Sequence, residues 1–236
     1  MNKTLLSICP SRGRPDTLKD MLGSFAETRS DKSDLIVYLN DDDPKLPEYR
    51  TMLAENYFKF AVVVIGPRKF IAEVFNEFSL AHPEYDYYQP FNDDHYFHTY
   101  HWDEKLIDIV EEKGKGWGIA CADDLLTDWA NFKHPSGCVI SGNIIRTLGY
   151  MIPPGVRHIG IDTVLGKLAQ AIDRLWFTRD VIIEHRHWTN GRRKIDDNYK
   201  WVYGTEEQNH GKRAVQMYLL TEFKKDVEKL REAMNK

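Results

Sequence analysis

Cysteine is scarce in this sequence. Only Cys9, Cys121 and Cys138 occur among its 236 residues, and no two of them have the C-x-x-C spacing. An odd number of unclustered cysteines argues against a disulfide framework and against a structural zinc site. We therefore expect three reduced and mostly buried thiols.

Long apolar runs and an excess of basic residues are also missing. The longest apolar stretches, residues 60–66 and 181–183, are far shorter than the roughly 20 residues that span a bilayer. The N-terminal segment has neither a secretory-length apolar core nor a small-residue cleavage site. With 32 Lys and Arg against 36 Asp and Glu, the net charge of −4 removes the general argument for a nucleic-acid-binding domain. We expect a cytoplasmic protein without a membrane partner.

The composition that remains is that of a soluble globular protein, with 42% hydrophobic and 29% charged residues. The length is enough for one sizeable domain. No internal repeat, low-complexity tract or linker divides the chain. We expect a single domain over residues 1–236, with a nucleotide-binding half (1–100), an acceptor and metal half (101–195), and a lid with a C-terminal helix (196–236).

Strands and helices alternate with short loops over the first half. The predicted strands are residues 4–9, 34–39, 61–65 and 85–89, and the predicted helices are residues 16–28 (with Asp16 as N-cap), 47–57 and 68–81. The strands are mostly apolar and do not alternate cleanly, which is typical of a parallel sheet buried on both faces. Polar clusters follow them, where open α/β sheets bind ligands.

The second half is less regular. Helices are predicted at residues 103–112, 143–148, 162–172 and 221–234, and strands at residues 117–122, 137–141 and 180–187. The predicted fold class is therefore α/β, with a mostly parallel Rossmann-like sheet flanked by helices and a mixed second half.

A candidate metal site follows the strand at residues 85–89, in the run Asn92-Asp93-Asp94-His95. Carboxylate oxygens on such a turn can hold Mg²⁺ or Mn²⁺ while the cation keeps positions open for phosphate oxygens. The alternative is an ordinary turn rich in Asp and Asn. His185 and His187 point to the same face of a late strand. Either imidazole could join the same cation, although such pairs are often structural.

Three further features have two interpretations each. Asp162 opens a predicted helix, where it could be an N-cap or the general base for an acceptor hydroxyl. The run Arg192-Arg193-Lys194 could supply cationic donors or form a solvated turn. The segment Thr189–Lys212, rich in Gly, Asn and charge, could be a mobile lid or a surface excursion.

The ordered set of motifs resembles the nucleotide-sugar glycosyltransferases of the GT-A fold over about residues 3–190. LLSICPSRGRPDTLKDML resembles their first strand, loop and helix, and IVYLNDDDP resembles the second strand with its nucleoside-binding acid. DYYQPFNDDHYFHTYHWDEKL resembles the DXD strand, here with an amide in place of the first acid. GWGIACADD and VIIEHRHW resemble the acceptor-side strand and the late metal-ligand strand. The similarity is greatest to small, single-domain glycosyltransferase-like proteins of bacteriophages.

The resemblance implies a role for each matching residue. The nucleotide and donor sugar are expected to contact Pro10, Ser11, Arg12, Arg14, one of Asp41, Asp42 and Asp43, Arg68 with Lys69, Asn92 and Asp93. The metal is expected at Asp94 with His185 or His187. Asp162 is the expected catalytic base, and Asp123 and Asp124 are expected on the acceptor side.

Residues and resemblance together predict a glycosyltransferase that uses Mn²⁺ or Mg²⁺. It would move a sugar from a nucleoside diphosphate sugar, UDP by resemblance, to a hydroxyl with inversion. The expected acceptor is a hydroxymethylated pyrimidine in phage DNA or a small saccharide, in the cytoplasm of an infected host. A nucleotidyltransferase is the alternative enzyme, although only one glycine follows the first strand. A non-catalytic protein that binds sugar or a partner on a degenerate transferase fold is the other alternative.

Overall fold

The computed structural model describes residues 3–55, 60–127 and 136–236. The predicted end of the second helix at Tyr57 lies outside these residues. The elements in chain order are β1 (Leu5–Ser11), α1 (Pro15–Thr28), β2 (Ser33–Asn40), α2 (Leu46–Glu55), β3 (Ala61–Gly66), α3 (Ile71–Ala81), β4 (Tyr87–Pro90), β5 (His95–Phe97), α4 (Trp102–Gly114), β6 (Ile119–Asp123), β7 (Cys138–Ser141), α5 (Gly142–Leu148), α6 (Ile161–Ala171), β8 (Leu175–His185), the 3-10 turn η1 (Trp188–Asn190), α7 (Asp197–Val202), α8 (Thr205–Thr221) and α9 (Phe223–Met234).

The strands form one mixed sheet in the order β3-β2-β1-β4-β7-β6-β8-β5. β3, β2, β1 and β4 are parallel, as the alternation of strands and helices predicts. β7 runs antiparallel to both β4 and β6, β8 is parallel to β6, and β5 is antiparallel to β8. The predicted fold class, a mostly parallel first half with a mixed second half, is confirmed.

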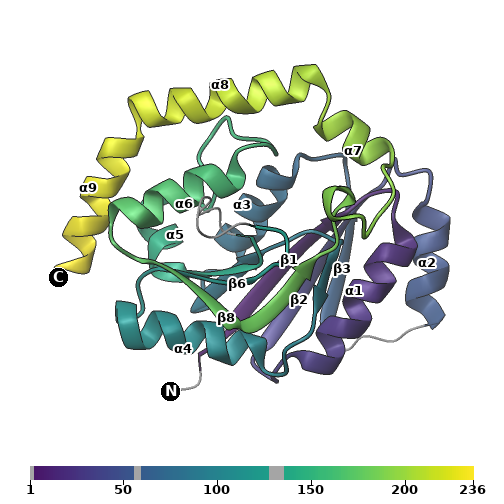
Figure 1. Ribbon diagram of the computed structural model, residues 1–236, viewed down its shortest axis with the longest axis horizontal. Coiled ribbons are helices and arrows are strands. Elements are labelled where there is room, and N and C mark those ends of the chain that lie inside the picture. Colours follow the sequence, from purple (N-terminus) through teal and green to yellow (C-terminus); the bar gives the residue numbers. More distant parts are fainter. Residues whose placement is uncertain (1–2, 56–59, 128–135) are drawn as a thin grey trace.

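Both faces of the sheet are buried, which explains why the strands lack a polar face. In β1, Leu6 and Ile8 join the hydrophobic cluster that α3, α5, α6 and α9 cover, while Leu5 and Cys9 join the cluster under α1, α2 and α4. Figure 1 shows the sheet between these two helical layers, with α8 and α9 running along one side of the molecule. All three cysteines are buried free thiols, as expected.

Two predicted helix starts are wrong. Helix α1 begins at Pro15 with Arg14 as N-cap, so Asp16 lies inside the first turn. Proline is well suited to the first helical position because its φ is already helical and its missing N–H is not needed there. Helix α3 begins at Ile71 rather than at Arg68, because the Glu73 carboxylate accepts a hydrogen bond from the Phe70 N–H and closes the N-terminus there.

The C-terminal part differs most from prediction. The expected final helix at residues 221–234 is α9, and it is preceded by a helix that was not predicted, α8, which ends where α9 is about to begin. The segment from residue 189 onward contains η1, α7 and the beginning of α8. The late strand is also longer than predicted, because it starts at Leu175 and ends at His185. None of the helices in the described part of the chain has the length and apolar character needed to cross a bilayer.

The edge pair β5–β8 places two histidines side by side. His95 of β5 lies directly opposite His185 of β8 in the antiparallel register. The two rings are nearly parallel, with centroids 4.6 Å apart. This pairing joins the turn after β4 to the end of β8, although some ninety residues separate them in the chain, and so positions the site.

Candidate metal and donor site

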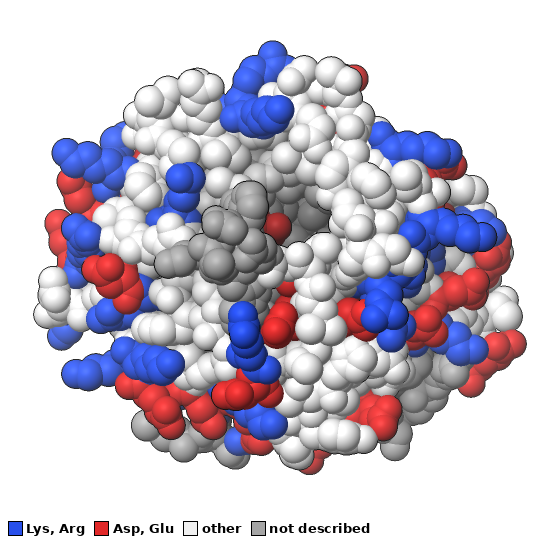
Figure 2. Space-filling model, in the orientation of Figure 1, with Lys and Arg blue, Asp and Glu red and all other residues white. Residues whose placement is uncertain are grey.

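A cavity of about 700 Å³ opens at the carboxyl ends of β1, β2, β4 and β8. Its volume lies within the range of roughly 300–1,000 Å³ that is usual for small-molecule sites. Figure 2 shows a hollow near the middle of one face of the molecule, with an acidic side chain at its floor. The lining residues come from the turn after β1, the start of α3, the turn after β4, the start of α6, the end of β8, and α7. The cavity therefore lies at the strand ends, where the sequence predicts ligand binding.

Asp94, His95 and His185 form a group whose ligand atoms lie within 4.8 Å of one another. Asp94 Oδ1 is 3.3 Å from His185 Nε2 and 3.8 Å from His95 Nδ1. Asp94 and His95 are almost fully buried, and the His185 side chain is 17% exposed. No other group of this kind occurs among the described residues. Two imidazoles and one carboxylate can together hold a divalent first-row transition-metal cation.

The two oxygens of Asp94 have different environments. Oδ2 accepts hydrogen bonds from the Tyr199 hydroxyl, at 2.6 Å, and from Arg14 Nη1, at 3.5 Å. Oδ1 is buried and has no hydrogen-bond partner of good geometry, although it faces the two histidines. A buried carboxylate oxygen without a donor is costly unless a cation occupies its open side. Asp94, His95 and His185 therefore fit a divalent metal.

Arg14, which lines the cavity, contacts three carboxylates, of which Asp93 and Asp94 also line it. It contacts Asp93 at 3.2 Å, Asp94 at 3.5 Å and Asp196 at 2.6 Å, and its guanidinium lies 4.2 Å above the Tyr199 ring. One guanidinium therefore faces three carboxyl groups, and this acidic surrounding favours a cation beside Asp94.

The ionisation of the histidines follows from this arrangement. Burial, and then the nearby His185, lower the pKa of His95 to about 4, so its ring is neutral at pH 7. Burial also favours neutral His185, but the negative charge of Asp94 outweighs it and raises the pKa of His185. Imidazole binds a metal in its neutral form, so a metal at this site would displace the His185 proton.

His187 lies outside the metal group. Its Nδ1 is 2.7 Å from the Thr189 hydroxyl, and its Nε2 is 3.1 Å from the Tyr203 hydroxyl. The sequence left open whether His185 or His187 would approach Asp94, and the structure brings only His185 there. The alternation of side chains along a strand does not apply to His187, because β8 ends at His185.

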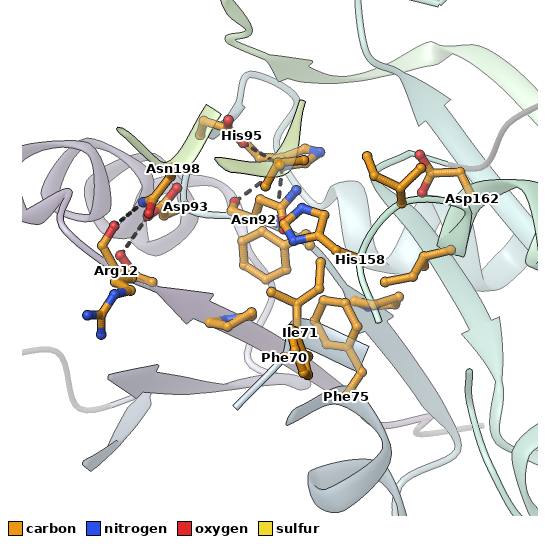
Figure 3. Close-up of a pocket in the computed structure, with 18 of the residues that line it drawn as sticks. Arg12, Phe70, Ile71, Phe75, Asn92, Asp93, His95, His158, Asp162 and Asn198 are labelled. Carbon is orange, nitrogen blue, oxygen red and sulfur yellow. Dashed lines mark hydrogen bonds and ion pairs between the residues drawn. The ribbon is translucent and has the colours of Figure 1, made fainter. Parts of the chain in front are cut away.

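Asp162 lies on the side of the cavity opposite Arg12 and Asp93 (Figure 3). Its side chain is exposed to the cavity, and desolvation by the protein around it is the largest effect that raises its pKa to about 6. It is not the N-cap of α6, because Gly160 occupies that position in the left-handed conformation. A carboxylate with this pKa can accept a proton near neutral pH.

Most residues expected to contact the donor do line the cavity. They are Pro10, Ser11, Arg12, Arg14, Arg68, Lys69, Asn92 and Asp93. Asp93 is almost fully buried and accepts a 2.6 Å hydrogen bond from the Ser11 hydroxyl. Burial, together with the charge of Asp94, raises the pKa of Asp93, although Arg14 opposes this.

The acids after β2 have other partners. Asp42 forms an ion pair with Arg12, and Asp41 is exposed. Asp43 is buried, and its carboxylate accepts hydrogen bonds from the backbone N–H groups of Gly13 and Lys45. None of the three acids lines the cavity, whereas Asn40, the last residue of β2, does.

The two acids expected on the acceptor side also lie outside the cavity lining. Asp123 accepts a hydrogen bond from the Leu125 N–H. Asp124 is buried and accepts hydrogen bonds from the Leu126 N–H and from both the N–H and the hydroxyl of Thr127. Both carboxylates therefore shape the loop after β6.

Several cavity residues were not singled out from the sequence. His95 directly follows Asp94 in the turn motif, and an imidazole next to a candidate metal carboxylate is itself a sign of a metal ligand. Tyr199 and Asp196 carry no motif, because their contacts with Asp94 and Arg14 exist only in the folded chain. His158 and Trp201, whose rings are 6.2 Å apart, complete the wall of the cavity beside α7.

Solved structures with a similar fold include several transferases with bound donors or nucleotides. The mannosyltransferase PcManGT from Pyrobaculum calidifontis, in complex with GDP-Man and Mn²⁺, aligns with a TM-score of 0.61 and 12% identity over 97% of this chain and 73% of that chain. S. aureus TarS 1–349 in complex with UDP-GlcNAc aligns with a TM-score of 0.56 and 10% identity over 94% of this chain and 73% of that chain. The same fragment with UDP has a TM-score of 0.55, at 11% identity over 94% and 72% of the two chains.

No protein-family model and no curated protein sequence matches the chain. At 10–12% identity, the structural likeness establishes the fold. That fold is the one of GT-A-type nucleotide-sugar glycosyltransferases, and the Asp94, His95 and His185 group lies in its cavity.

Proposed function

We propose that this protein is a metal-dependent glycosyltransferase that takes a sugar from a nucleoside diphosphate sugar and inverts the anomeric centre. The observation that carries the proposal is the buried Oδ1 of Asp94, which lacks a hydrogen-bond donor of good geometry and faces two histidines inside a cavity of donor size. The Mn²⁺ and nucleotide sugars in the structurally similar proteins support it.

The donor would lie with its nucleotide toward β1 and its sugar toward Asp162. Ser11, Arg12 and Arg68 line the β1 side of the cavity, and Asp162 lines the far side. Figure 3 shows the two sides, with Asn92 and His158 between them. A bound cation would stabilise the negative charge of the leaving diphosphate. Asp94, His95 and His185 would hold that cation, and Arg14 would keep the Asp94 carboxylate in place.

The reaction is a single displacement. The acceptor oxygen forms a bond to the anomeric carbon as the bond from that carbon to the diphosphate oxygen breaks. The proton of the acceptor hydroxyl passes to the Asp162 carboxylate, whose pKa of about 6 leaves it mostly deprotonated at pH 7. Attack from the side opposite the leaving group inverts the configuration. A nucleotidyltransferase is less well supported, because the similar structures bind sugar donors.

A panel of nucleoside diphosphates tests the donor and the metal together. We expect UDP with Mn²⁺ to raise the melting temperature, because a ligand present at 100 times its Kd adds about 2.7 kcal/mol, or about 5–10 °C for a domain of this size. UDP without a divalent metal should have little effect, and GDP and CDP should have less than UDP. Equal shifts with every nucleotide, with or without metal, would contradict the proposal.

The acceptor we propose is a hydroxymethylated pyrimidine in DNA. Two exposed side chains capable of stacking border the cavity, namely Trp201 of α7 at 43% exposure and Tyr203, which follows α7, at 46%. The basic run 192–194 precedes them in the chain, and the Arg192 side chain is 65% exposed although it pairs with Glu184. Aromatic rings beside cationic groups suit a nucleic acid strand better than a neutral saccharide.

The salt dependence of acceptor binding distinguishes a DNA acceptor from a small neutral saccharide. Binding of a DNA acceptor releases counterions, so the logarithm of its association constant should fall linearly with the logarithm of salt concentration. The measurement is fluorescence anisotropy of a labelled oligonucleotide between about 50 and 200 mM salt. A salt-independent KM for a small saccharide, with no binding of DNA, would remove DNA as the acceptor.

A further inference from the structure

Helix α7 contacts the proposed metal ligand from outside the metal group. The Tyr199 hydroxyl donates a 2.6 Å hydrogen bond to Asp94 Oδ2, and the Tyr199 ring packs 4.9 Å from the His187 ring, centroid to centroid. Tyr199 is itself buried, and 105 residues separate it from Asp94 in the chain. Helix α7, which forms part of the cavity wall, therefore contacts Asp94 through the Tyr199 hydroxyl.

A second set of contacts fixes the same helix to Arg14. The Asp196 carboxylate accepts hydrogen bonds from Arg14 Nε at 2.6 Å and from Nη2 at 2.9 Å. Asp196 also caps α7, because its Oδ1 accepts a hydrogen bond from the Tyr199 N–H. Asn198 adds a hydrogen bond to the Arg12 carbonyl oxygen. Helix α7 thus holds Asp94 through Tyr199 directly and through Arg14 indirectly.

We propose that Tyr199 is a positioning residue for the metal, and that cation binding and the docking of α7 over the cavity stabilise each other. The inference rests on the metal site of the proposed function. Tyr199 and Arg14 use Oδ2 of Asp94, which leaves Oδ1 as the oxygen directed at His95 and His185. A carboxylate free to rotate would lose this orientation, and partners that orient a metal ligand typically contribute 10–100-fold to metal affinity.

The coupling must act in both directions. If docked α7 favours the metal-binding orientation of Asp94, then a bound cation favours docked α7 by the same free energy. Trp201 and Val202 of α7 line the cavity, so the docked helix forms part of its wall. The cation would therefore complete the wall of the site as well as bind the diphosphate.

The test is the affinity for Mn²⁺ alone, measured by electron paramagnetic resonance of the free ion. We expect Tyr199→Phe to bind Mn²⁺ about 10–100-fold more weakly than the wild type. Tyr203→Phe is the matched control, because the Tyr203 hydroxyl contacts His187 and not Asp94, and it should keep the wild-type Mn²⁺ affinity. Circular dichroism and melting temperature without metal establish that both variants fold.

Amide hydrogen exchange of the wild type gives a second measurement that needs no variant. Saturating Mn²⁺ should slow exchange in residues 197–202 and leave α9 unchanged. If Asp94→Ala abolishes Mn²⁺ binding while Tyr199→Phe binds like the wild type, the positioning role is wrong and the metal site stands. If the wild type binds no Mn²⁺, both the metal site and this inference are wrong.

Discussion

Replacing Asp94 by alanine is expected to lower kcat/KM by at least about 1,000-fold, which corresponds to about 4 kcal/mol of transition-state stabilisation. Asp94 supplies the only carboxylate of the metal group found in the described parts of the chain, and its Oδ1 faces both imidazoles. Loss of that oxygen leaves two imidazoles to hold a doubly charged cation. This change in kcat/KM is measured by steady-state kinetics with a UDP-sugar at several Mn²⁺ concentrations.

The same substitution should remove the metal-dependent part of UDP binding. Calorimetric titration of UDP with and without Mn²⁺ should give the same weak affinity for Asp94→Ala in both conditions. Asp108→Ala is a suitable control, because Asp108 is an exposed acid on α4. A variant at Asp94 that keeps Mn²⁺-stimulated turnover would show that the cation binds elsewhere.

The sequence is most informative where structure depends on local pattern. The alternation of apolar strands with amphipathic helices predicts the four parallel strands, because parallel sheets are covered by helices on both faces; β3, at the edge, is partly exposed. The turn after β4 could also be placed correctly, because the ends of parallel strands meet at one edge of a sheet. This is why the sequence could single out Asp94, which the structure places in the cavity beside His95 and His185.

The features of the fold and site that the sequence does not predict depend on contacts between distant segments. Strand β5 has three residues, which is too short for a recognisable period, yet its register with β8 brings His95 opposite His185. The pair formed by Arg14 and Asp196 joins residues 182 positions apart. Asp43, an acid that the sequence offers to a nucleoside, accepts the backbone N–H groups of Gly13 in the loop after β1 and of Lys45 in its own turn. Only the folded chain separates these roles.

Replacing Asp162 by asparagine is expected to reduce kcat by about 10²–10⁴-fold and leave donor affinity near that of the wild type. The carboxylate lies in the cavity wall opposite the β1 side, where an acceptor hydroxyl can reach it, and an amide cannot take up that proton. Desolvation raises its pKa to about 6, so the base is active above this pH and protonated below it. The wild-type kcat should therefore fall as the pH drops below about 6 and level off above about 7.

The pH profile and the variant must agree for Asp162 to be the base. The residual activity of Asp162→Asn should lack the fall near pH 6, because the group that causes it is gone. Asp123→Asn is the matched comparison, since the Asp123 side chain holds the Leu125 N–H outside the cavity, and its turnover should stay close to wild type. Unchanged kcat in Asp162→Asn would exclude it as the base. If Asp123→Asn instead lost both turnover and the fall near pH 6, while Asp162→Asn kept that fall, the proton acceptor would lie on the loop after β6.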